Sequence, residues 1–181
     1  MTDAVLETER LIVRRFTPDD APFILRLLNE PSFIQNIGDR AVRTLEQARR
    51  YLLDGPIASY ERHGHGLWLA ALKPSLQPAG MCGILKRDQL PDADLGYAFL
   101  PEFWSKGYAL EAARATVDWA RARRMPRIVA IVSPGNEPSI RLLGKLGFAL
   151  ERRMRLTPDA PEVALYGLAL ASAGRERDRL P

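Results

Sequence analysis

Cysteine and histidine are scarce in this chain of 181 residues, which has one cysteine, Cys82, and two histidines, His63 and His65. A single cysteine cannot form an internal disulfide, so the disulfide framework of small secreted domains is excluded. The two histidines and one thiol show no spacing that resembles a zinc site. We therefore predict no metal, and we interpret Cys82, which lies in an apolar stretch, as an inert packed thiol.

Long hydrophobic runs are missing as well. Clearly apolar runs such as residues 128–132 are far shorter than the roughly 18 residues that a membrane-crossing helix needs. The first ten residues are too acidic for a secretory signal peptide. These absences lead us to expect a cytoplasmic protein with no membrane partner.

Charge of one sign is in small excess, since 26 Lys and Arg stand against 22 Asp and Glu, for a formal net charge of +4. Arginines gather at residues 121–127 and 152–155, but acids lie nearby and no aromatic residues are interleaved with them. We interpret both groups as solvated surface. A nucleic-acid-binding domain is thus the weaker hypothesis, although a modest positive field is enough to attract a polyanionic ligand.

The composition that is present, 46% hydrophobic and 27% charged, is that of one globular domain. A chain of this length is close to one domain and buries about 70% of its unfolded surface. We predict a single domain over residues 1–172, followed by a polar C-terminal tail over residues 173–181.

Strand and helix signals alternate in the first part of the chain. Residues 10–16 are rich in Leu, Ile, Val and Phe and predict a strand. Residues 17–20 (Thr-Pro-Asp-Asp) combine a capping hydroxyl, a proline and first-turn carboxylates, which predicts a helix start. A capping box at residues 44–47 predicts a second helix to about Tyr60, and residues 29–43 are expected to form a loop or a broken helix.

The rest of the chain predicts an antiparallel meander followed by strands that alternate with helices. Small apolar residues at helical spacing predict a helix from Gly107 to Arg124, and Pro138 opens another. The predicted strands lie at residues 66–72, 80–85, 94–99, 128–132, 148–156 and 162–170. The continuous apolar run at 128–132 is typical of a strand covered on both faces.

Two helix starts carry residues suited to binding. Residues 99–109 lead from a strand end into a helix, where the first amides have no internal partner and the dipole supplies about half a positive charge. A turn kept narrow by Ser105, Gly107 and Ala109 lets a phosphate touch the backbone. Such a glycine is more often only a turn residue. The second start, after the buried strand, places Asn136 and Ser139 at the next helix.

These residues resemble the GNAT acetyltransferase superfamily, in particular the branch that includes bacterial ribosomal-protein N-terminal acetyltransferases. The resemblance covers most of the chain, and its segments follow in the right order. They are residues 6–11, which look like an L-x-T-x-R-L opening, 94–97, 101–113 and 136–148. At the acetyl-CoA turn the family pattern Gln/Arg-x-x-Gly-x-Gly/Ala is matched by residues 104–109. Trp104 replaces the usual Gln or Arg, and Ser105 stands where Gly is commoner.

The resemblance implies an α/β (α+β) fold with a mixed, mostly antiparallel, seven-stranded sheet flanked by about four helices. The fourth and fifth strands are expected to splay apart, with pantetheine in the gap. Phe99 is expected on the strand whose backbone meets the pantetheine and polarises the acetyl carbonyl, because fixed N–H groups stabilise an oxyanion. The other implied cofactor-binding residues are Trp104, Ser105, Lys106, Gly107, Tyr108, Ala109 and Asn136. A helix cap is the alternative role of Asn136.

Two candidate catalytic residues also follow from the resemblance. Many GNAT enzymes have a proton-donating Tyr seven residues after the Asn, where this chain has Leu143. Ser139 matches a serine proposed as proton donor in the ribosomal-protein branch, and a capping hydroxyl is its alternative role. Asp94 matches an acid that takes the amine proton through water, and a simple strand-edge acid is the alternative. We interpret Tyr97 as groove wall.

The sequence therefore predicts an acetyl-CoA-dependent N-acetyltransferase that transfers the acetyl group directly to a primary amine. Acetyl-CoA is the implied co-substrate, and neither a metal nor a covalent enzyme intermediate is expected. Protein N-termini and small molecules such as polyamines, amino acids and aminoglycosides all remain open as acceptors. Because the usual tyrosine is absent, a non-catalytic acyl-CoA-binding module is the alternative. We expect a monomer or a homodimer.

Overall fold

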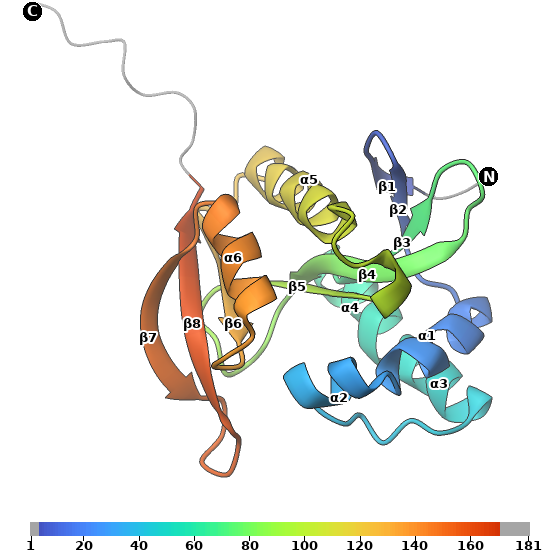
Figure 1. The fold of residues 1–181 in the computed structure, drawn as a ribbon, viewed down its shortest axis with the longest axis horizontal. Helices are drawn as coiled ribbons and strands as arrows, with labels where there is room; N and C mark the ends of the chain where they lie inside the picture. Colours follow the sequence, from blue (N-terminus) through green and yellow to red (C-terminus); the bar gives the residue numbers. More distant parts are fainter. Residues whose placement is uncertain (1–3, 171–181) are drawn as a thin grey trace, which may run out of the picture.

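The computed structural model describes residues 4–170, which build one eight-stranded sheet with helices on both faces (Figure 1). The strand order is β1-β2-β3-β4-β5-β6-β8-β7. Every neighbouring pair is antiparallel except β5 and β6, which run parallel. The predicted mixed, mostly antiparallel sheet is confirmed, with eight strands in place of seven.

The additional strand lies at the N-terminal side, where the sequence predicted one strand and the structure has a hairpin. Thr8 closes its turn, because its N–H donates to the Leu11 carbonyl at 2.9 Å and its Oγ1 accepts from the Leu11 N–H at 3.0 Å. The strands are β1 (Ala4–Glu7), β2 (Leu11–Arg14), β3 (Leu67–Leu72), β4 (Pro78–Leu85), β5 (Asp94–Phe99), β6 (Arg127–Val132), β7 (Ala149–Arg155) and β8 (Glu162–Ala169).

The N-terminal helices form a layer on one face of the sheet and are more broken than predicted. They are α1 (Ala21–Leu28), preceded by a 3-10 turn (Pro18–Asp20), then α2 (Pro31–Asn36), α3 (Leu45–Leu52), a π-helical segment (Leu53–Ile57) and α4 (Ala58–His63). The predicted capping box is confirmed, since Thr44 Oγ1 accepts from the Gln47 N–H at 3.2 Å. Pro56 removes a helical N–H and accounts for the π-helical segment.

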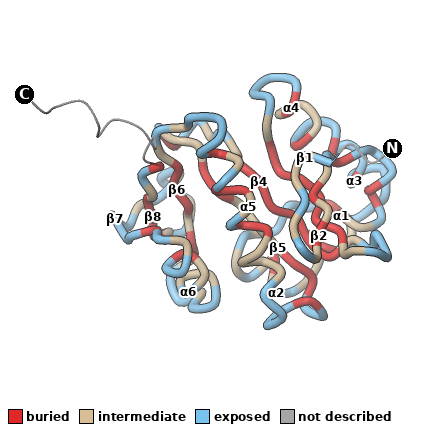
Figure 2. Tube along the Cα trace, turned by 90° about the horizontal axis from the view of Figure 1, so that it is seen from above, coloured by how far each residue is buried: buried red, intermediate tan, exposed pale blue. Residues whose placement is uncertain are grey.

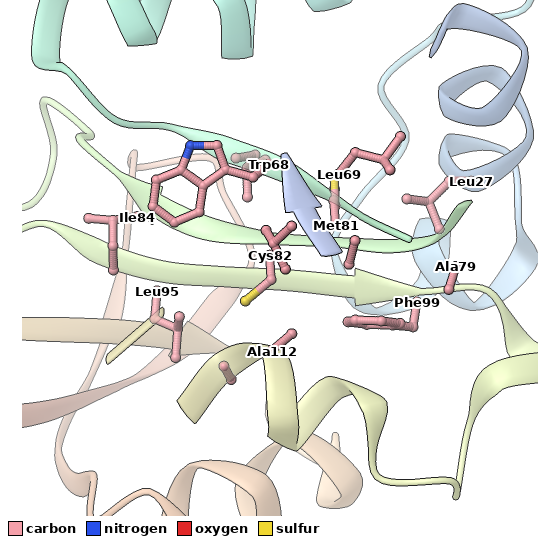
Figure 3. Packing of buried hydrophobic residues seen from close by; sticks show 14 of the residues in the cluster. Leu27, Trp68, Leu69, Ala79, Met81, Cys82, Ile84, Leu95, Phe99 and Ala112 are labelled. Atoms are coloured by element: carbon pink, nitrogen blue, oxygen red, sulfur yellow. The ribbon is translucent and has the colours of Figure 1, made fainter. Parts of the chain in front are cut away.

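Two longer helices, α5 (Tyr108–Ala122) and α6 (Glu137–Lys145), follow β5 and β6, and a 3-10 turn (Pro101–Phe103) precedes α5. The small residues Ala112, Ala113 and Thr116 are fully buried where α5 packs on β4 and β5. Figure 3 shows the Cys82 sulfur turned toward Ala112. The sulfur lies 3.4 Å from Thr116 Oγ1, and burial raises the pKa of Cys82 to about 12, which fits an inert thiol.

The two faces of the sheet follow from the strand register, because residues paired across an antiparallel ladder point to the same face. Cys82 pairs with Trp68 and Tyr97, so these side chains share the face covered by α5. Asp94 pairs with Leu85 and points to the opposite face, which carries α1 to α4. Figure 2 shows that burial concentrates in the inner strands and that β7 is largely exposed.

Within residues 4–170, no helix is both long and apolar enough to cross a membrane. The same residues contain no group of three or more His, Cys, Asp or Glu side chains arranged to hold a metal ion. The predicted polar tail, residues 173–181, lies outside the described residues.

Candidate active site

The parallel strands β5 and β6 separate just after they meet. Their only register pair within the described residues is Asp94 with Val129, at the start of β5. The Val129 N–H donates to the Ala93 carbonyl at 2.9 Å and closes this end. The splay predicted between the fourth and fifth strands thus occurs between β5 and β6, because the N-terminal hairpin adds one strand to the count.

The splay leaves backbone groups of β5 without a neighbouring strand. Successive residues of a strand direct their N–H and C=O groups alternately to the two sides. The Ala93 carbonyl points to β6, so the backbone groups of Tyr97 and Phe99 point to that side too, beyond the last paired residue. Phe99 lies where the sequence predicted it, and Tyr97 joins it through its backbone. Such an unpaired edge can bind an extended ligand as an added strand.

The turn before α5 has the tight backbone that the sequence predicted. Ser105 has φ +59° and Gly107 has φ +83°, both in the left-handed region. Gly107 occupies the N-cap position, and no side chain caps the helix. The first amides of α5 are therefore open to an anionic ligand, favoured by the helix dipole.

Trp104 joins this turn to the unpaired edge of β5. Its indole Nε1–H donates to the Phe99 carbonyl at 2.7 Å, and the side chain is 48% exposed. The Phe99 carbonyl thus has a partner, whereas the Phe99 N–H faces the splay. The sequence identified Trp104 only as a replacement for Gln or Arg, because a bond from a side chain to a strand carbonyl leaves no local pattern.

The start of α6 approaches the splay from the other strand. Asn136 caps the helix, since its Oδ1 accepts from the Ser139 N–H at 3.3 Å. The Tyr97 hydroxyl lies 3.5 Å from the Ser139 carbonyl oxygen, at the outer limit of a hydrogen bond. Burial raises the pKa of Tyr97 to about 12, so its hydroxyl stays protonated at neutral pH. Tyr97 of β5 therefore approaches the Asn136-capped start of α6 through the Ser139 carbonyl.

Comparison with known proteins assigns this arrangement of splayed strands and open helix start to a family. The family model described as Acetyltransferase (GNAT) domain matches residues 10–149, which is most of the chain. The chain belongs to the GNAT acetyltransferase family. Membership in this family implies acetyl transfer.

Two curated relatives from Bacillus subtilis (strain 168) support the assignment. The uncharacterized N-acetyltransferase YoaA is 30% identical over 154 residues, which cover 83% of this chain and 86% of YoaA. The uncharacterized protein YkkB is 34% identical over 96 residues, or 51% of this chain. That match spans only 56% of the length of YkkB.

Solved structures share the GNAT fold across nearly the whole chain. An acetyltransferase from Agrobacterium tumefaciens is 28% identical with a TM-score of 0.76, covering 90% of this chain and 92% of its own. RimL, a ribosomal alpha-N-protein acetyltransferase solved in complex with coenzyme A, has a TM-score of 0.78 at 18% identity. The match covers 99% of RimL and 93% of this chain, so the two share the fold.

Asp94 lies at the closed end of the GNAT splay and is 1% exposed. Burial raises the pKa of its carboxyl, and the Arg87 guanidinium, with Nε 3.0 Å from Oδ2, opposes this rise. The alternative role as a strand-edge acid does not apply, because β5 lies between β4 and β6. Asp94 and Tyr97, three residues apart on β5, point to opposite faces of the sheet, and the Ser139 backbone carbonyl lies on the Tyr97 side.

A hollow of about 220 Å³ lies between the N-terminal helices and the ends of β3 and β4, on the same face as Asp94. Leu67 and Leu85 form its sheet side, and Tyr51 and Ser59 come from the helices. The sequence expected acceptor walls in residues 29–43, the second helix and the loop before the last strand. Of these, only the second helix lines the hollow.

Proposed function

We propose that this GNAT protein is an acetyl-CoA-dependent N-acetyltransferase that transfers the acetyl group directly to a primary amine. The observation that carries the proposal is the unpaired edge of β5, which adjoins the uncapped start of α5. The unpaired strand edge suits the amides of a pantetheine arm, and the uncapped helix start suits a pyrophosphate. Both features lie on one chain segment, a few residues apart.

In this proposal the amides of Lys106 to Ala109 hold the pyrophosphate, and the Tyr97 and Phe99 backbone holds the pantetheine. Trp104 and Ser105 shape the turn, and Asn136 binds the pantetheine arm through its Nδ2 group while Oδ1 caps α6. The coenzyme A complex of RimL, which has the same fold, supports a cofactor site of this kind.

The chain would use the two faces of its sheet for the two proton movements of the reaction. A new N–C bond forms as the C–S bond breaks, so the amine must lose a proton and the thiolate must gain one. Asp94 would take the amine proton through water on the face of α1 to α4, and its raised pKa makes it the stronger base. Ser139 would give a proton to the thiolate on the α5 face.

Backbone N–H groups of Tyr97 and Phe99 would stabilise the oxyanion that develops on the acetyl carbonyl, because they are fixed before the reaction begins. The hollow beside Tyr51 and Leu85 is our candidate for the acceptor side, since it opens on the face that carries Asp94. A protein N-terminus and a small-molecule amine both fit this chemistry. A cytoplasmic location is part of the proposal, and the buried free thiol of Cys82 is consistent with it.

A non-catalytic acyl-CoA-binding module is the second candidate. Leu143 stands where many GNAT enzymes have their proton-donating tyrosine, and its buried hydrocarbon side chain has no proton to donate. The two candidates share cofactor binding and differ in turnover.

Two measurements test the proposal in order. Thermal melting with coenzyme A or acetyl-CoA at a hundred times the Kd should show stabilisation by about 2.7 kcal/mol. A thiol-release screen over peptide N-termini, polyamines, amino acids and aminoglycosides should then find turnover on at least one amine. No melting shift at millimolar ligand overturns both candidates, and a shift without turnover on any amine favours the binding module. A salt-sensitive shift with DNA would instead favour nucleic-acid binding.

A further inference from the structure

The N-terminal segment that resembles L-x-T-x-R-L has no part in the chemistry above, yet its side chains reach the start of α5. Thr8 and Arg10 lie in the β1–β2 turn, and Glu111 lies in the first turn of α5, 101 residues beyond Arg10. Glu111 Oε1 accepts from Thr8 Oγ1 at 2.6 Å and from the Arg10 N–H at 2.9 Å. Glu111 Oε2 accepts from Arg10 Nε at 2.7 Å and lies 2.6 Å from Arg10 Nη2.

The third guanidinium nitrogen of Arg10, Nη1, binds the turn itself. Nη1 donates to the Lys106 carbonyl at 2.9 Å, and the guanidinium carbon lies 4.5 Å from the centroid of the Tyr108 ring. A planar guanidinium can hold a carboxylate and a carbonyl at once in a fixed geometry, which an ammonium cannot. Arg10 therefore contacts residues on both sides of Gly107.

The hydrogen bond from Arg10 to the Lys106 carbonyl fixes the direction of the next amide, that of Gly107. In a trans peptide the C=O of one residue and the N–H of the next point in opposite directions. Because the Lys106 carbonyl points to Arg10, the Gly107 N–H points away from it. β1 and β2 lie on one side of β4 and β5, and β6 lies on the other (Figure 1). The Gly107 N–H is thus turned away from the hairpin that carries Arg10.

The same contacts remove an electrostatic obstacle. A free carboxylate in the first turn of α5 would repel a phosphate bound at that helix start. Burial tends to raise the pKa of Glu111, but the hydrogen bonds from Thr8 and Arg10 outweigh it and hold the pKa below its usual value. The carboxylate is therefore charged, and Arg10 neutralises it directly.

The contacts among Thr8, Arg10 and Glu111 are not explained by the stability of the fold alone. The Arg10 side chain is 42% exposed, and ion pairs with such exposure contribute little to folding. The cluster instead spans about a hundred residues of sequence to fix one peptide group in the turn.

We propose that Arg10 is a positioning residue for the acetyl-CoA site: it fixes the Lys106–Gly107 peptide and neutralises Glu111, so that the turn presents its amides to the pyrophosphate. This inference rests on the proposed function, because it concerns the same cofactor turn. Arg10 acts through Lys106 and Glu111 and need not touch the cofactor.

The test is calorimetric titration of coenzyme A into the wild-type chain and matched variants. Arg10→Ala should raise the Kd by about tenfold to a hundredfold, because misplaced contacts of a binding turn are costly. Arg10→Lys keeps the charge but loses the fork, and should weaken binding by at least about fivefold. Arg121→Ala is the control, because Arg121 pairs with Asp118 at 2.7 Å at the other end of α5. Its Kd should equal that of the wild type.

Further readouts separate positioning from a general loss of structure. The melting temperature of ligand-free Arg10→Ala should fall by only about 1–3 °C, as for an exposed ion pair. With an acceptor from the amine screen, KM for acetyl-CoA should rise while kcat at saturation stays the same. Should Arg10→Ala fail to fold, Thr8→Val removes one bond to Glu111, together with the turn bond from the Leu11 N–H, and leaves the guanidinium in place. It should raise the Kd by about twofold to fivefold.

Each contrary result is distinct. A wild-type chain that binds no coenzyme A overturns the proposed function, and the inference on Arg10 falls with it. A wild-type chain that binds, together with Arg10→Ala or Arg10→Lys of equal affinity, overturns the inference alone. A kcat that falls together with a melting temperature lower by more than about 5 °C assigns Arg10 a structural role and also overturns it.

Discussion

The helices α5 and α6 both begin beside the β5–β6 splay, but their first turns are completed in different ways. At α6, the Asn136 side chain accepts the Ser139 N–H, and Pro138 has no N–H to satisfy. At α5, Gly107 stands at the cap position with φ +83° and no side chain bonds to the first amides. The start of α6 is complete within the protein, whereas the start of α5 leaves its donors for a ligand.

The turns before the two helices are held in different ways. Ser105 and Gly107 both take left-handed φ values before α5, and Arg10 holds the turn from outside. Before α6, the left-handed Gly135 lies in open space, since a Cβ at that position would have no other atom within 4 Å, and the cap comes from the next residue. We expect changes at the start of α5 to affect cofactor affinity and a change at Ser139 of α6 to affect turnover.

The largest effect is expected for Gly107→Val, which should abolish the melting shift with coenzyme A. A β-branched residue strains a backbone at φ +83°, and a Cβ there would lie 3.2 Å from Arg10 Nη2 and block close approach of a phosphate. Gly64→Val is the matched control, because its φ of +73° imposes similar strain in open space away from the proposed cofactor site. Equal loss of the shift in both variants would contradict the assignment of the phosphate to α5.

Ser139→Ala should keep the coenzyme A affinity and lose roughly tenfold to several hundredfold in kcat, because general acids contribute about 10²–10⁴ and water substitutes in part. Thiol release with an accepted amine measures this loss. Ser133→Ala is the control, since the Ser133 hydroxyl donates to the Asn36 carbonyl at 2.7 Å and not to the site. Unchanged turnover in Ser139→Ala would move the proton donor elsewhere, with the Tyr97 hydroxyl as the nearest candidate.

Asp94→Asn should lower kcat/KM by about tenfold near pH 7, where the acceptor is mainly ammonium and the carboxylate takes its proton, and the difference should shrink as pH falls through the raised pKa of Asp94. Burial raises the pKa of Asp94, so the carboxylate becomes an active base only as pH rises through that elevated value. The wild-type acid limb should therefore lie above the ordinary range of an aspartate and be absent in the variant. Profiles from about pH 6 to 9 measure this.

Asp92→Asn is the control for Asp94, because Asp92 lies two residues away and pairs with Arg127 at 2.9 Å. Its profile should keep the wild-type shape. A uniform fall across the whole range in Asp94→Asn would argue for lost geometry at the Arg87 pair and against a base.

The sequence predicted those parts of the molecule that local patterns encode. The capping box at Thr44 and the antiparallel meander are confirmed, because each depends on spacing within a short stretch of sequence, and the splay that the family resemblance implied is found between β5 and β6. The β1–β2 hairpin was missed, since β1 has only four residues (Ala-Val-Leu-Glu). Its pairing with β2 is also interrupted by a register shift between Ala4 and Leu6, so no clear alternation marks it as a strand.

In the candidate site, too, local patterns were predicted and contacts between separate elements were not. The turn with Ser105 and Gly107 was predicted from its small residues, and its left-handed backbone agrees with that prediction. The contacts of Trp104 with Phe99 and of Arg10 with Glu111 were not predicted, because side-chain contacts between separate elements leave no periodic signal. The roles of Asp94, Ser139 and Asn136 in catalysis and binding stay predictions.

The smallest effect is expected for Ser105→Gly, which should raise the melting temperature by about 1–4 °C and leave the coenzyme A affinity within about twofold. Ser105 has φ +59°, and a non-glycine residue in this region costs about 1–3 kcal/mol. Glycine relieves that strain but gives back roughly 0.5–1 kcal/mol through the greater freedom of the unfolded chain. Arg124→Gly is the control, because Arg124 has φ +57° beyond the far end of α5 and should gain similar stability.

Comparison of Ser105→Gly with Arg124→Gly tests whether the backbone strain at Ser105 contributes to coenzyme A binding. If Ser105→Gly melts higher and binds coenzyme A as well as the wild type, the turn geometry is set by Gly107 and Arg10, and the serine is only tolerated. If Ser105→Gly binds more weakly while Arg124→Gly does not, the serine side chain restricts the turn to its binding conformation. The start of α5 would then be pre-organised from within as well as from the β1–β2 hairpin, in contrast to the start of α6, which its own asparagine completes.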